Sequence, residues 1–339
     1  MKQSKMLYGG LKALGRELAG DSWAGAHYVI IVDENTFEHC LPSLLGSVEA
    51  LQEAEFVEVP VGEECKTLEV AAQVWQTLLE GDADRDTVIV NLGGGAVCDL
   101  GGFVAAGYKR GLRHINVPTT LLAMTDAAIG GKTAIDFGGV KNSIGHFYPA
   151  AVTVIEPAFL GTLPKVETLS GMFEMIKTAA VTDSDLYVHI MGADTATRRS
   201  IGDVARIKTR VVKADPYDHG IRKILNFGHT FGHAVEVYSK LPHGIAVGIG
   251  MKAAMYLSVN KLGMDYVWHR AYSLWLAHHT EVPTYTLKDV EPMLALMRQD
   301  KKNTAGTLRC VLLQEPGAAV IDVEVTEMEA VDALLKLGR

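Results

Sequence analysis

Residues 88–106, VIVNLGGGAVCDLGGFVAA, decide the fold class. The β-branched run predicts a buried strand, Gly93–Gly95 predict a tight turn, and the segment that follows predicts a helix. Such a helix directs its unpaired first-turn amides into the turn, where an anionic phosphate is a natural guest, and glycine lets the ligand approach the backbone. The stretch does not match G-x-G-x-x-G, because Cys98 stands in place of the last glycine. The acidic residue expected about 20 positions later is also missing. A tight strand-to-helix turn without a ligand therefore remains an alternative.

Strand-like segments recur on both sides of this stretch. They are HYVIIV at 27–32, EFVEVPV at 55–61, DTVIVNL at 86–92, HINVP at 114–118 and AVTVIEP at 151–157. Between the second and third, apolar residues recur at helical spacing over residues 68–79. This alternation predicts a parallel sheet that is covered on both faces.

The pattern changes beyond Pro164, where long helical stretches dominate. They lie near 165–191, 195–214, 227–240, 244–262 and 288–299. The sequence therefore predicts an α/β domain over residues 1–160 and a helical domain over residues 161–339.

The composition is that of an ordinary globular protein. The chain has 339 residues, of which 48% are hydrophobic and 21% charged, and its formal net charge is −8. This charge argues against nucleic-acid binding, because neutralising phosphate backbones requires clustered Lys and Arg. No signal-like segment and no run of 18 apolar residues is present, so we expect a soluble protein without membrane association. The four cysteines form no C-x-x-C pair, which fits a reducing cytoplasm; they are Cys40, Cys65, Cys98 and Cys310.

A second chemical signal is the histidine pair in LNFGHTFGHAVE, residues 225–236. The spacing of His229 and His233 puts both on one helical face, a frequent arrangement for transition-metal ligands. A third histidine, His243, follows in LPHGIAVG. Each histidine taken alone is as readily a hydrogen-bonded helix or core residue. The pattern leaves open which of the three hold a metal.

Several blocks of sequence together resemble the 3-dehydroquinate synthase family. They are GGGAVCDLGGFVAAGYKRG at 93–111, VPTTLLAMTDAAIGGKTAID at 117–136, KNSIGHFY at 141–148, SGMFEMIK at 170–177, and RKILNFGHTFGHAVE at 222–236 with the HG of 243–244. The blocks keep the family's order across about 25–310. The resemblance implies a Rossmann-like NAD-binding α/β N-terminal domain and an all-α C-terminal domain that binds metal and substrate. It also implies that the active site lies in the cleft between them.

The resemblance implies a catalytic divalent ion, zinc or cobalt, held by Glu174, His229 and His243. The fourth side of the ion is open to substrate, as in catalytic rather than structural zinc sites. Two neutral imidazoles and one carboxylate leave the ion with a net positive charge, which polarises hydroxyl groups. In the family the histidine that matches His233 faces the substrate and is not a ligand.

The implied substrate is a seven-carbon sugar-acid phosphate, whose phosphate and carboxylate need a local basic pocket. The residues that match substrate contacts of the family are Arg110, Asp126, Lys132, Lys141, Asn142, Lys177, Lys208, Arg222, Asn226, His233, and Lys301 or Lys302. Arg110 matches an arginine that reaches into the neighbouring subunit's site, which implies a homodimer. Each cation taken alone is as readily a solvated surface charge.

The residues that match NAD contacts are Asp33, Asn35, Glu63, Lys66, Gly93, Gly94, Gly95, Asp99, Thr119, Thr120, Lys132 and Lys141. The glycines and Asp99 match the pyrophosphate and nicotinamide end. Asp33 matches the adenosine side, where a carboxylate favours the free ribose hydroxyls of NAD over a 2′-phosphate. Thr119 and Thr120 are also residue types that cap helix N-termini. Taken alone, Asp33 is as readily a turn residue that closes a strand.

The implied activity is the conversion of 3-deoxy-D-arabino-heptulosonate 7-phosphate to 3-dehydroquinate and phosphate, a carbon–oxygen lyase reaction of the shikimate pathway to aromatic amino acids. It runs through transient oxidation by NAD, phosphate elimination, re-reduction and an intramolecular aldol closure. Three alternatives remain. They are another sugar-phosphate cyclase, a metal-dependent NAD alcohol or glycerol dehydrogenase that accumulates NADH, and a metal-loaded binding module without turnover.

Three residues near one loop depart from the family pattern. Asp136 stands where Asn is usual, and His146 and Pro149 stand where Ala and Gln are common. None of them is an expected metal ligand. They lie in or next to the segment that carries Lys141 and Asn142.

Overall fold

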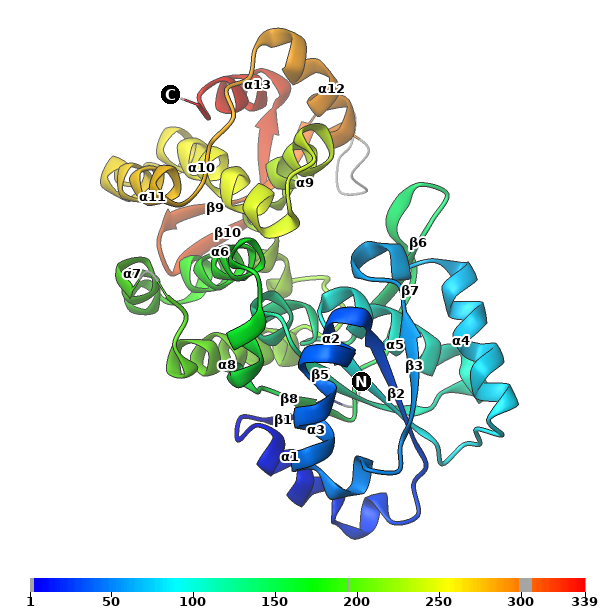
Figure 1. Cartoon of the computed structure of the whole chain (residues 1–339). Helices are drawn as coiled ribbons and strands as arrows, with labels where there is room; N and C mark the ends of the chain where they lie inside the picture. The colour runs from blue at the N-terminus through cyan, green and yellow to red at the C-terminus, as the bar shows by residue number, and fades with distance from the viewer. Residues whose placement is uncertain (1–2, 194, 299–306, 339) are drawn as a thin grey trace. The chain divides into compact units, whose positions relative to one another are not determined.

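The computed structural model describes residues 3–193, 195–298 and 307–338 (Figure 1). The chain divides into two compact units, unit 1 from Met1 to Pro164 and unit 2 from Lys165 to Arg339. The division lies slightly beyond the boundary predicted at residue 160. Each unit has its own core and its own candidate site residues.

Unit 1 is built on the parallel sheet that the sequence predicts. Its strands are β1 (Lys5–Leu7), β2 (Tyr28–Asp33), β3 (Glu55–Val59), β4 (Val88–Gly93), β5 (Arg113–Pro118) and β8 (Val152–Val154). They lie in the order β1-β8-β5-β4-β2-β3, and every neighbouring pair is parallel. The short edge strand β1 was not predicted.

Helices cover both faces of this sheet. They are α1 (Leu11–Leu18), α2 (Glu34–His39), α3 (Leu41–Ser47), α4 (Leu68–Glu80) and α5 (Gly95–Gly107), with the short turns η1 (Asp21–Trp23), η2 (Glu49–Leu51), η3 (Gly62–Cys65), η4 (Tyr108–Arg110), η5 (Ala123–Ala127) and η6 (Pro157–Thr162). Successive side chains of a strand point to opposite faces. All six residues of β2 are buried, so neither face of the sheet is left to solvent there.

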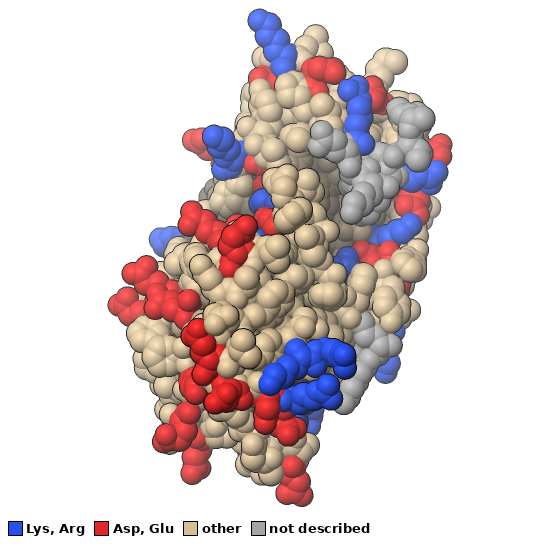
Figure 2. All heavy atoms as spheres, turned by 90° about the vertical axis from the view of Figure 1, so that its right-hand side faces the viewer, with Lys and Arg blue, Asp and Glu red and all other residues tan. Residues whose placement is uncertain are grey.

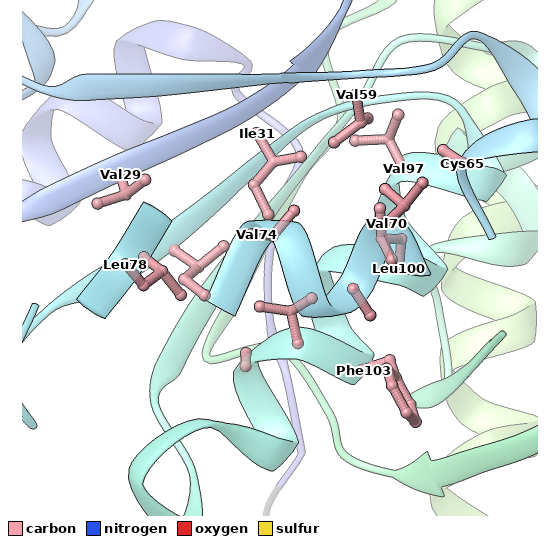
Figure 3. Packing of buried hydrophobic residues seen from close by; sticks show 14 of the residues in the cluster. Val29, Ile31, Val59, Cys65, Val70, Val74, Leu78, Val97, Leu100 and Phe103 are labelled. Carbon is pink, nitrogen blue, oxygen red and sulfur yellow. The ribbon is translucent and has the colours of Figure 1, made fainter. Parts of the chain in front are cut away.

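The face toward α4 and α5 forms the core of unit 1 (Figure 3). Val74 of α4 lies next to Ile31 of β2, Leu78 lies nearer Val29, and Leu100 of α5 belongs to the same cluster. Helix α4 begins where the Thr67 side chain accepts a hydrogen bond from the Val70 amide. Truncating one such buried side chain lowers the free energy of unfolding by about 2–5 kcal/mol. Because β4 and α5 both contribute residues to this core, the packing also holds the glycine turn between them in place.

A β-hairpin that the sequence did not predict also belongs to unit 1. Strands β6 (Lys132–Phe137) and β7 (Val140–Phe147) pair antiparallel, with a register shift between Ile135 and Phe137. Every residue of β7 is exposed. The hairpin carries several of the expected site residues, and Asp136 lies at the register shift.

Unit 2 is mainly helical. Its helices are α6 (Lys165–Thr182), α7 (Ser184–Ala193), α8 (Arg198–Ala214), α9 (His229–Ser239), α10 (His243–Leu262), α11 (Tyr266–His279), α12 (Leu287–Arg298) and α13 (Glu327–Leu335), with the turn η7 (Ile221–Asn226). Helix α10 is buried on nearly all sides and contacts α6, α9 and α11. The description as all-α needs one correction, because β9 (Thr307–Glu315) and β10 (Ala318–Thr326) form an antiparallel hairpin that packs against α10.

Charge and cysteine chemistry agree with an acidic globular protein. Figure 2 shows acidic side chains spread over one face and a compact group of Lys and Arg in its lower part. All four cysteines are buried free thiols. Among the residues that the structure describes, no helix is both long and apolar enough to cross a membrane.

Candidate active site

Unit 2 brings together the three predicted metal ligands. Glu174 lies on α6, while His229 and His243 are the first residues of α9 and α10. The Nε2 atoms of His229 and His243 lie 3.9 and 3.6 Å from Oε1 of Glu174. One ligand atom from each residue lies within 4.8 Å of the others, a spacing that suits a single ion.

Two glycines allow these helices to present their ligands. Gly228, just before His229, has φ of 78°, a left-handed conformation that turns the chain into α9. A Cβ on Gly244, just after His243, would lie 2.1 Å from the Ser170 carbonyl oxygen, so only glycine lets α10 approach α6 this closely. The Gly244 amide donates to Ser170 Oγ at 3.0 Å and fixes that approach.

A second group of possible ligands, His233, Glu236 and His243, overlaps the first. Glu236 Oε2 lies 2.8 Å from Nδ1 of His243, and the Phe227 carbonyl oxygen lies 3.2 Å from Nδ1 of His229. Both acceptors place the ring proton on Nδ1, which leaves each Nε2 lone pair on the side of Glu174. The hydrogen bonds therefore favour Glu174, His229 and His243 as ligands and make Glu236 an outer partner that orients His243.

The sequence predictions did not include Glu236. It follows His229 by two helical turns and His233 by one, so it lies on the same face of α9. That spacing was the signal that could have identified it.

The donor set fits a divalent metal ion. Glu174 is 1% exposed, and its Oε1 atom accepts no hydrogen bond from the described residues. A buried carboxylate oxygen without a donor is costly unless a cation satisfies it. Its other oxygen, Oε2, forms an ion pair with Lys177 one helical turn away. One carboxylate and two imidazoles are donors that zinc, cobalt and related ions accept.

The two histidines have opposite pKa shifts. Burial, together with the charge of Lys177, lowers the pKa of His229 well below its ordinary 6.5, so this ring is neutral at pH 7. Burial alone would lower the pKa of His243 as well. The Glu236 hydrogen bond and the Glu174 carboxylate outweigh burial and raise it. A metal ion must therefore displace a proton that His243 holds more firmly than an ordinary histidine does.

Three predicted substrate cations of unit 2 are buried. Lys177, Lys208 and Arg222 are 1%, 6% and 4% exposed. They lie on α6, α8 and η7, and these three elements contact one another. Lys and Arg are almost never fully buried unless they are paired. Lys177 is paired with Glu174, and Nη1 of Arg222 donates to the Pro216 carbonyl at 2.9 Å.

The remaining predicted residues of unit 2 have less definite surroundings. Asn226 ends η7 and is partly buried. The His233 ring is exposed and lies 5.2 Å from the His229 ring, between centroids. Lys301 and Lys302 fall outside the described residues.

In unit 1 the glycine turn forms as predicted. Gly93 ends β4, Gly94 precedes α5 and Gly95 begins it. The Thr119 amide donates to the Gly93 carbonyl at 3.0 Å, which joins this turn to the end of β5. Thr120 caps the next turn, where its Oγ1 accepts from the Ala123 amide at 3.1 Å. Asp126 lies in that turn, η5, a π-helical segment of a kind often found at functional sites.

The predicted NAD residues Lys66 and Asp99 form one cluster. Lys66 is 2% exposed, and its Nζ donates to Asp99 Oδ2 at 2.9 Å and to Asn142 Oδ1 at 2.5 Å. Glu63 Oε2 lies 3.6 Å from the same ammonium. Burial opposes the charge of Lys66, but the carboxylates of Asp99 and Glu63, with a smaller contribution from Asp136, outweigh burial and raise the pKa of Lys66. The structure thereby joins η3, α5 and the β6–β7 hairpin through one ammonium group.

Asp33 has a structural role that the sequence alternative anticipated. Its Oδ1 accepts from the Thr36 amide at 2.8 Å in a capping box at the start of α2. Asp33 still lies at the C-terminal end of β2, the edge where parallel sheets bind ligands. Its neighbour Asn35 is exposed.

Three predicted cations of unit 1 are exposed: Arg110, Lys132 and Lys141. Arg110 has φ of 70° and stands between Lys109 at 45° and Gly111 at 115°. Consecutive left-handed non-glycine residues are strained, and such strain is concentrated at functional sites.

Comparison with known proteins identifies the family on both halves of the chain. The family described as 3-dehydroquinate synthase N-terminal matches residues 56–170, and the one described as 3-dehydroquinate synthase C-terminal matches residues 171–303. A 3-dehydroquinate synthase from Parabacteroides distasonis is 38% identical over 316 residues, which make up 90% of this chain and 89% of that protein.

Solved structures share the fold. A 2-deoxy-scyllo-inosose synthase complexed with carbaglucose-6-phosphate, NAD+ and Co2+ has a TM-score of 0.85 at 22% identity and covers 99% of both chains. The 2-epi-5-epi-valiolone synthase from Streptomyces hygroscopicus, with NAD+ and Zn2+ bound, also has a TM-score of 0.85, at 25% identity, over 99% of this chain and 97% of that one. These likenesses confirm the predicted fold class. With both halves matched and a relative 38% identical over nearly its whole length, the chain belongs to the 3-dehydroquinate synthase family.

Proposed function

We propose that this protein converts 3-deoxy-D-arabino-heptulosonate 7-phosphate to 3-dehydroquinate and phosphate. The observation that carries the proposal is the buried group of Glu174, His229 and His243 in a chain whose two halves both match the synthase family. The reaction class is a carbon–oxygen lyase acting on phosphate, within aromatic amino acid biosynthesis. A homodimer in the cytoplasm is part of the proposal.

Glu174, His229 and His243 would hold the divalent ion, and the glycine turn with Lys66 and Asp99 would hold NAD. When bound, the ion polarises an alcohol of the substrate while NAD makes its oxidation and later re-reduction possible. The NAD+ and Zn2+ of the valiolone synthase structure support this pairing of cofactors.

The residues of unit 2 prepare the site for an anionic substrate. Lys208 and Arg222 are buried cations that would bind its charged groups with little loss of hydration on binding. The Arg222 guanidinium is held in place, because its Nη1 donates to the Pro216 carbonyl at 2.9 Å. His233 is exposed beside His229 and would meet the substrate hydroxyls.

The residues of unit 1 would bind the phosphate that leaves. Lys132 and Lys141 are exposed cations of the β6–β7 hairpin, and Asn142 adds an amide. Cations at the phosphate stabilise the negative charge that develops as the carbon–oxygen bond breaks. Arg110 would contribute to the site of a second subunit.

The alternatives differ in what they do with these residues. A dehydrogenase does not require cations that bind a substrate phosphate, and it releases NADH. Another sugar-phosphate cyclase shares the metal and NAD residues, but its substrate lacks the carboxylate that the buried cations of unit 2 suit. The family match favours the synthase over both.

One experiment separates these functions. The purified protein is incubated with NAD, Co2+ and the heptulosonate phosphate, while released phosphate and NADH absorbance are followed together. We expect phosphate equal to the substrate consumed and no net NADH. Steady growth of NADH would reject the proposal in favour of a dehydrogenase, and binding without phosphate release would reject enzymatic function.

A matched pair of variants ties the activity to the metal group. Glu174→Gln removes the buried carboxylate, and we expect phosphate release to be lost. Glu167→Gln makes the same change at an exposed position of the same helix, α6, and should leave the rate unchanged.

A further inference from the structure

The β6–β7 hairpin contains an irregularity at Asp136. Ile135 pairs with Ile144 and Phe137 pairs with Val140, so the single residue Asp136 stands opposite Lys141, Asn142 and Ser143. The extra residues of β7 form a bulge, a device that often aims side chains at a functional site. Two of the three, Lys141 and Asn142, are residues that the proposed function assigns to phosphate binding.

Asp136 holds this bulge through two hydrogen bonds. Its carboxylate Oδ1 accepts from the Asn142 amide at 2.7 Å. Its own amide donates to the Lys66 carbonyl at 2.7 Å, which attaches the hairpin to the segment after η3. Asn142 has φ of 51°, a left-handed conformation that residues other than Gly, Asn and Asp rarely adopt. The Asp136 side chain therefore fixes the backbone of the bulge at Asn142, the residue with the unfavourable left-handed conformation.

The same arrangement orients the Asn142 amide. Its Oδ1 accepts from the Lys66 ammonium at 2.5 Å. An ammonium only donates, so the carbonyl side of the amide must face Lys66 and the Nδ2 side is the one that donates to a ligand. Asn142 and Lys141 are both exposed, and an amide donor next to an ammonium group is the chemistry that recognises a phosphate.

We propose that Asp136 is a positioning residue that sets the bulge of Lys141 and Asn142 for phosphate. It acts through the hydrogen bond that its side-chain oxygen accepts from Asn142, and its negative charge is not required. The inference rests on the proposed function for the assignment of Lys141 and Asn142 to the phosphate. It gives a role to one of the three residues at which this chain departs from the family pattern.

The two replacements of Asp136 separate the hydrogen bond from the charge. Asp136→Asn keeps an oxygen that accepts from the Asn142 amide and removes the charge. Asp136→Ala removes both. Ser143→Ala is the matched control, because it removes a different side-chain hydrogen bond of the same bulge, the one that the Ser143 hydroxyl donates to the Phe137 carbonyl.

The test measures the Kd of inorganic phosphate by calorimetry, on protein loaded with NAD and Co2+, with the melting temperature of each variant recorded alongside. We expect Asp136→Ala to weaken phosphate binding by about fivefold, the equivalent of one ordinary hydrogen bond. Asp136→Asn and Ser143→Ala should stay within about twofold of the original protein. KM for the heptulosonate phosphate should rise with the Kd, while kcat changes less.

The inference is overturned if Asp136→Ala binds phosphate as tightly as the original protein, or if Asp136→Asn binds it as weakly as Asp136→Ala. If the alanine variant does not fold, the asparagine variant still decides, since any loss beyond about twofold contradicts a role through the hydrogen bond alone. Failure of the proposed function has a different signature, because then the unaltered protein itself releases no phosphate from the heptulosonate phosphate. An unaltered protein that does not bind inorganic phosphate would overturn the inference directly.

Discussion

Replacing Glu236 by Gln tests whether this carboxylate supports the metal centre from outside the ligand shell. Glu236 Oε2 lies 2.8 Å from Nδ1 of His243, and the Glu236 side chain is 11% exposed. Gln keeps the size and one acceptor oxygen but loses the charge. Loss of an outer partner of a metal-bound histidine typically costs 10–100-fold in metal affinity.

The expected size of the effect follows from the kind of hydrogen bond. A charge-assisted hydrogen bond is roughly twice as strong as a neutral one. We therefore expect Glu236→Gln to weaken Co2+ binding by about tenfold, or about 1.4 kcal/mol, and Glu236→Ala to approach 100-fold. Glu167→Gln on the exposed side of α6 is the control and should bind Co2+ as the original protein does.

The pH dependence sharpens this test. Glu236 contributes to raising the pKa of His243, so protons compete with the metal from a pH above 6.5 downward. The Gln variant has a lower His243 pKa, and its affinity begins to fall only at lower pH. The difference between the two proteins should thus be largest near pH 8 and shrink toward pH 6.

The assay is competition for Co2+ with a chromophoric chelator, repeated across this pH range. An unchanged Kd at pH 8 would refute the orienting role of Glu236. A loss as large as that of Glu174→Gln would also refute it, because it would make Glu236 a direct ligand together with His233.

Further predictions concern stability. Lys177→Met leaves the buried Glu174 carboxylate without its ion pair, so the metal-free protein should lose about 3–5 kcal/mol of unfolding free energy; Zn2+ should then raise its Tm more than it raises that of the original protein. Lys252 is a buried lysine of α10 that donates to the Leu337 carbonyl. Lys252→Met should therefore destabilise the protein without enlarging the rise in Tm that Zn2+ causes. Equal rises in Tm for the two variants would contradict the pairing of Lys177 with Glu174. Burial lowers the pKa of His114 to about 4 from 6.5, so the unfolded chain binds this proton more readily than the folded protein does. The free energy of unfolding should therefore fall by up to about 3 kcal/mol between pH 6.5 and pH 4 in the original protein, and this loss should be missing in His114→Leu. Parallel pH profiles of the two proteins would contradict this prediction. Gly228→Ala, at φ of 78°, should cost about 1–3 kcal/mol in urea unfolding and weaken Co2+ binding, and an unaffected variant would show that the turn into α9 is relaxed.

The parts of the fold with regular patterns could be predicted from the sequence. Strand β4, the glycine turn and α5 form where VIVNLGGGAVCDLGG places them, because a short β-branched apolar run favours a buried strand and glycines permit the tight turn that follows it. The hairpin β6–β7 could not be predicted in this way. All residues of β7 are exposed, so no alternation of apolar and polar residues marks it as a strand.

The metal group shows where local sequence patterns mislead. The spacing of His229 and His233 indicates a ligand pair, whereas the hydrogen bonds favour His229 with His243 and with Glu174 from another helix. These three residues meet only through the packing of α6, α9 and α10, which no local pattern contains. The family resemblance predicted these three residues as the metal ligands, and the structure identified Glu236 as the partner of His243.

The most direct test of the account is a crystal of the protein grown with Co2+, with diffraction data collected on both sides of the cobalt absorption edge. We predict one anomalous peak bonded to a carboxylate oxygen of Glu174 and to the Nε2 atoms of His229 and His243, with a side left for another ligand. A peak bonded instead to His233, Glu236 and His243 would contradict the central claim.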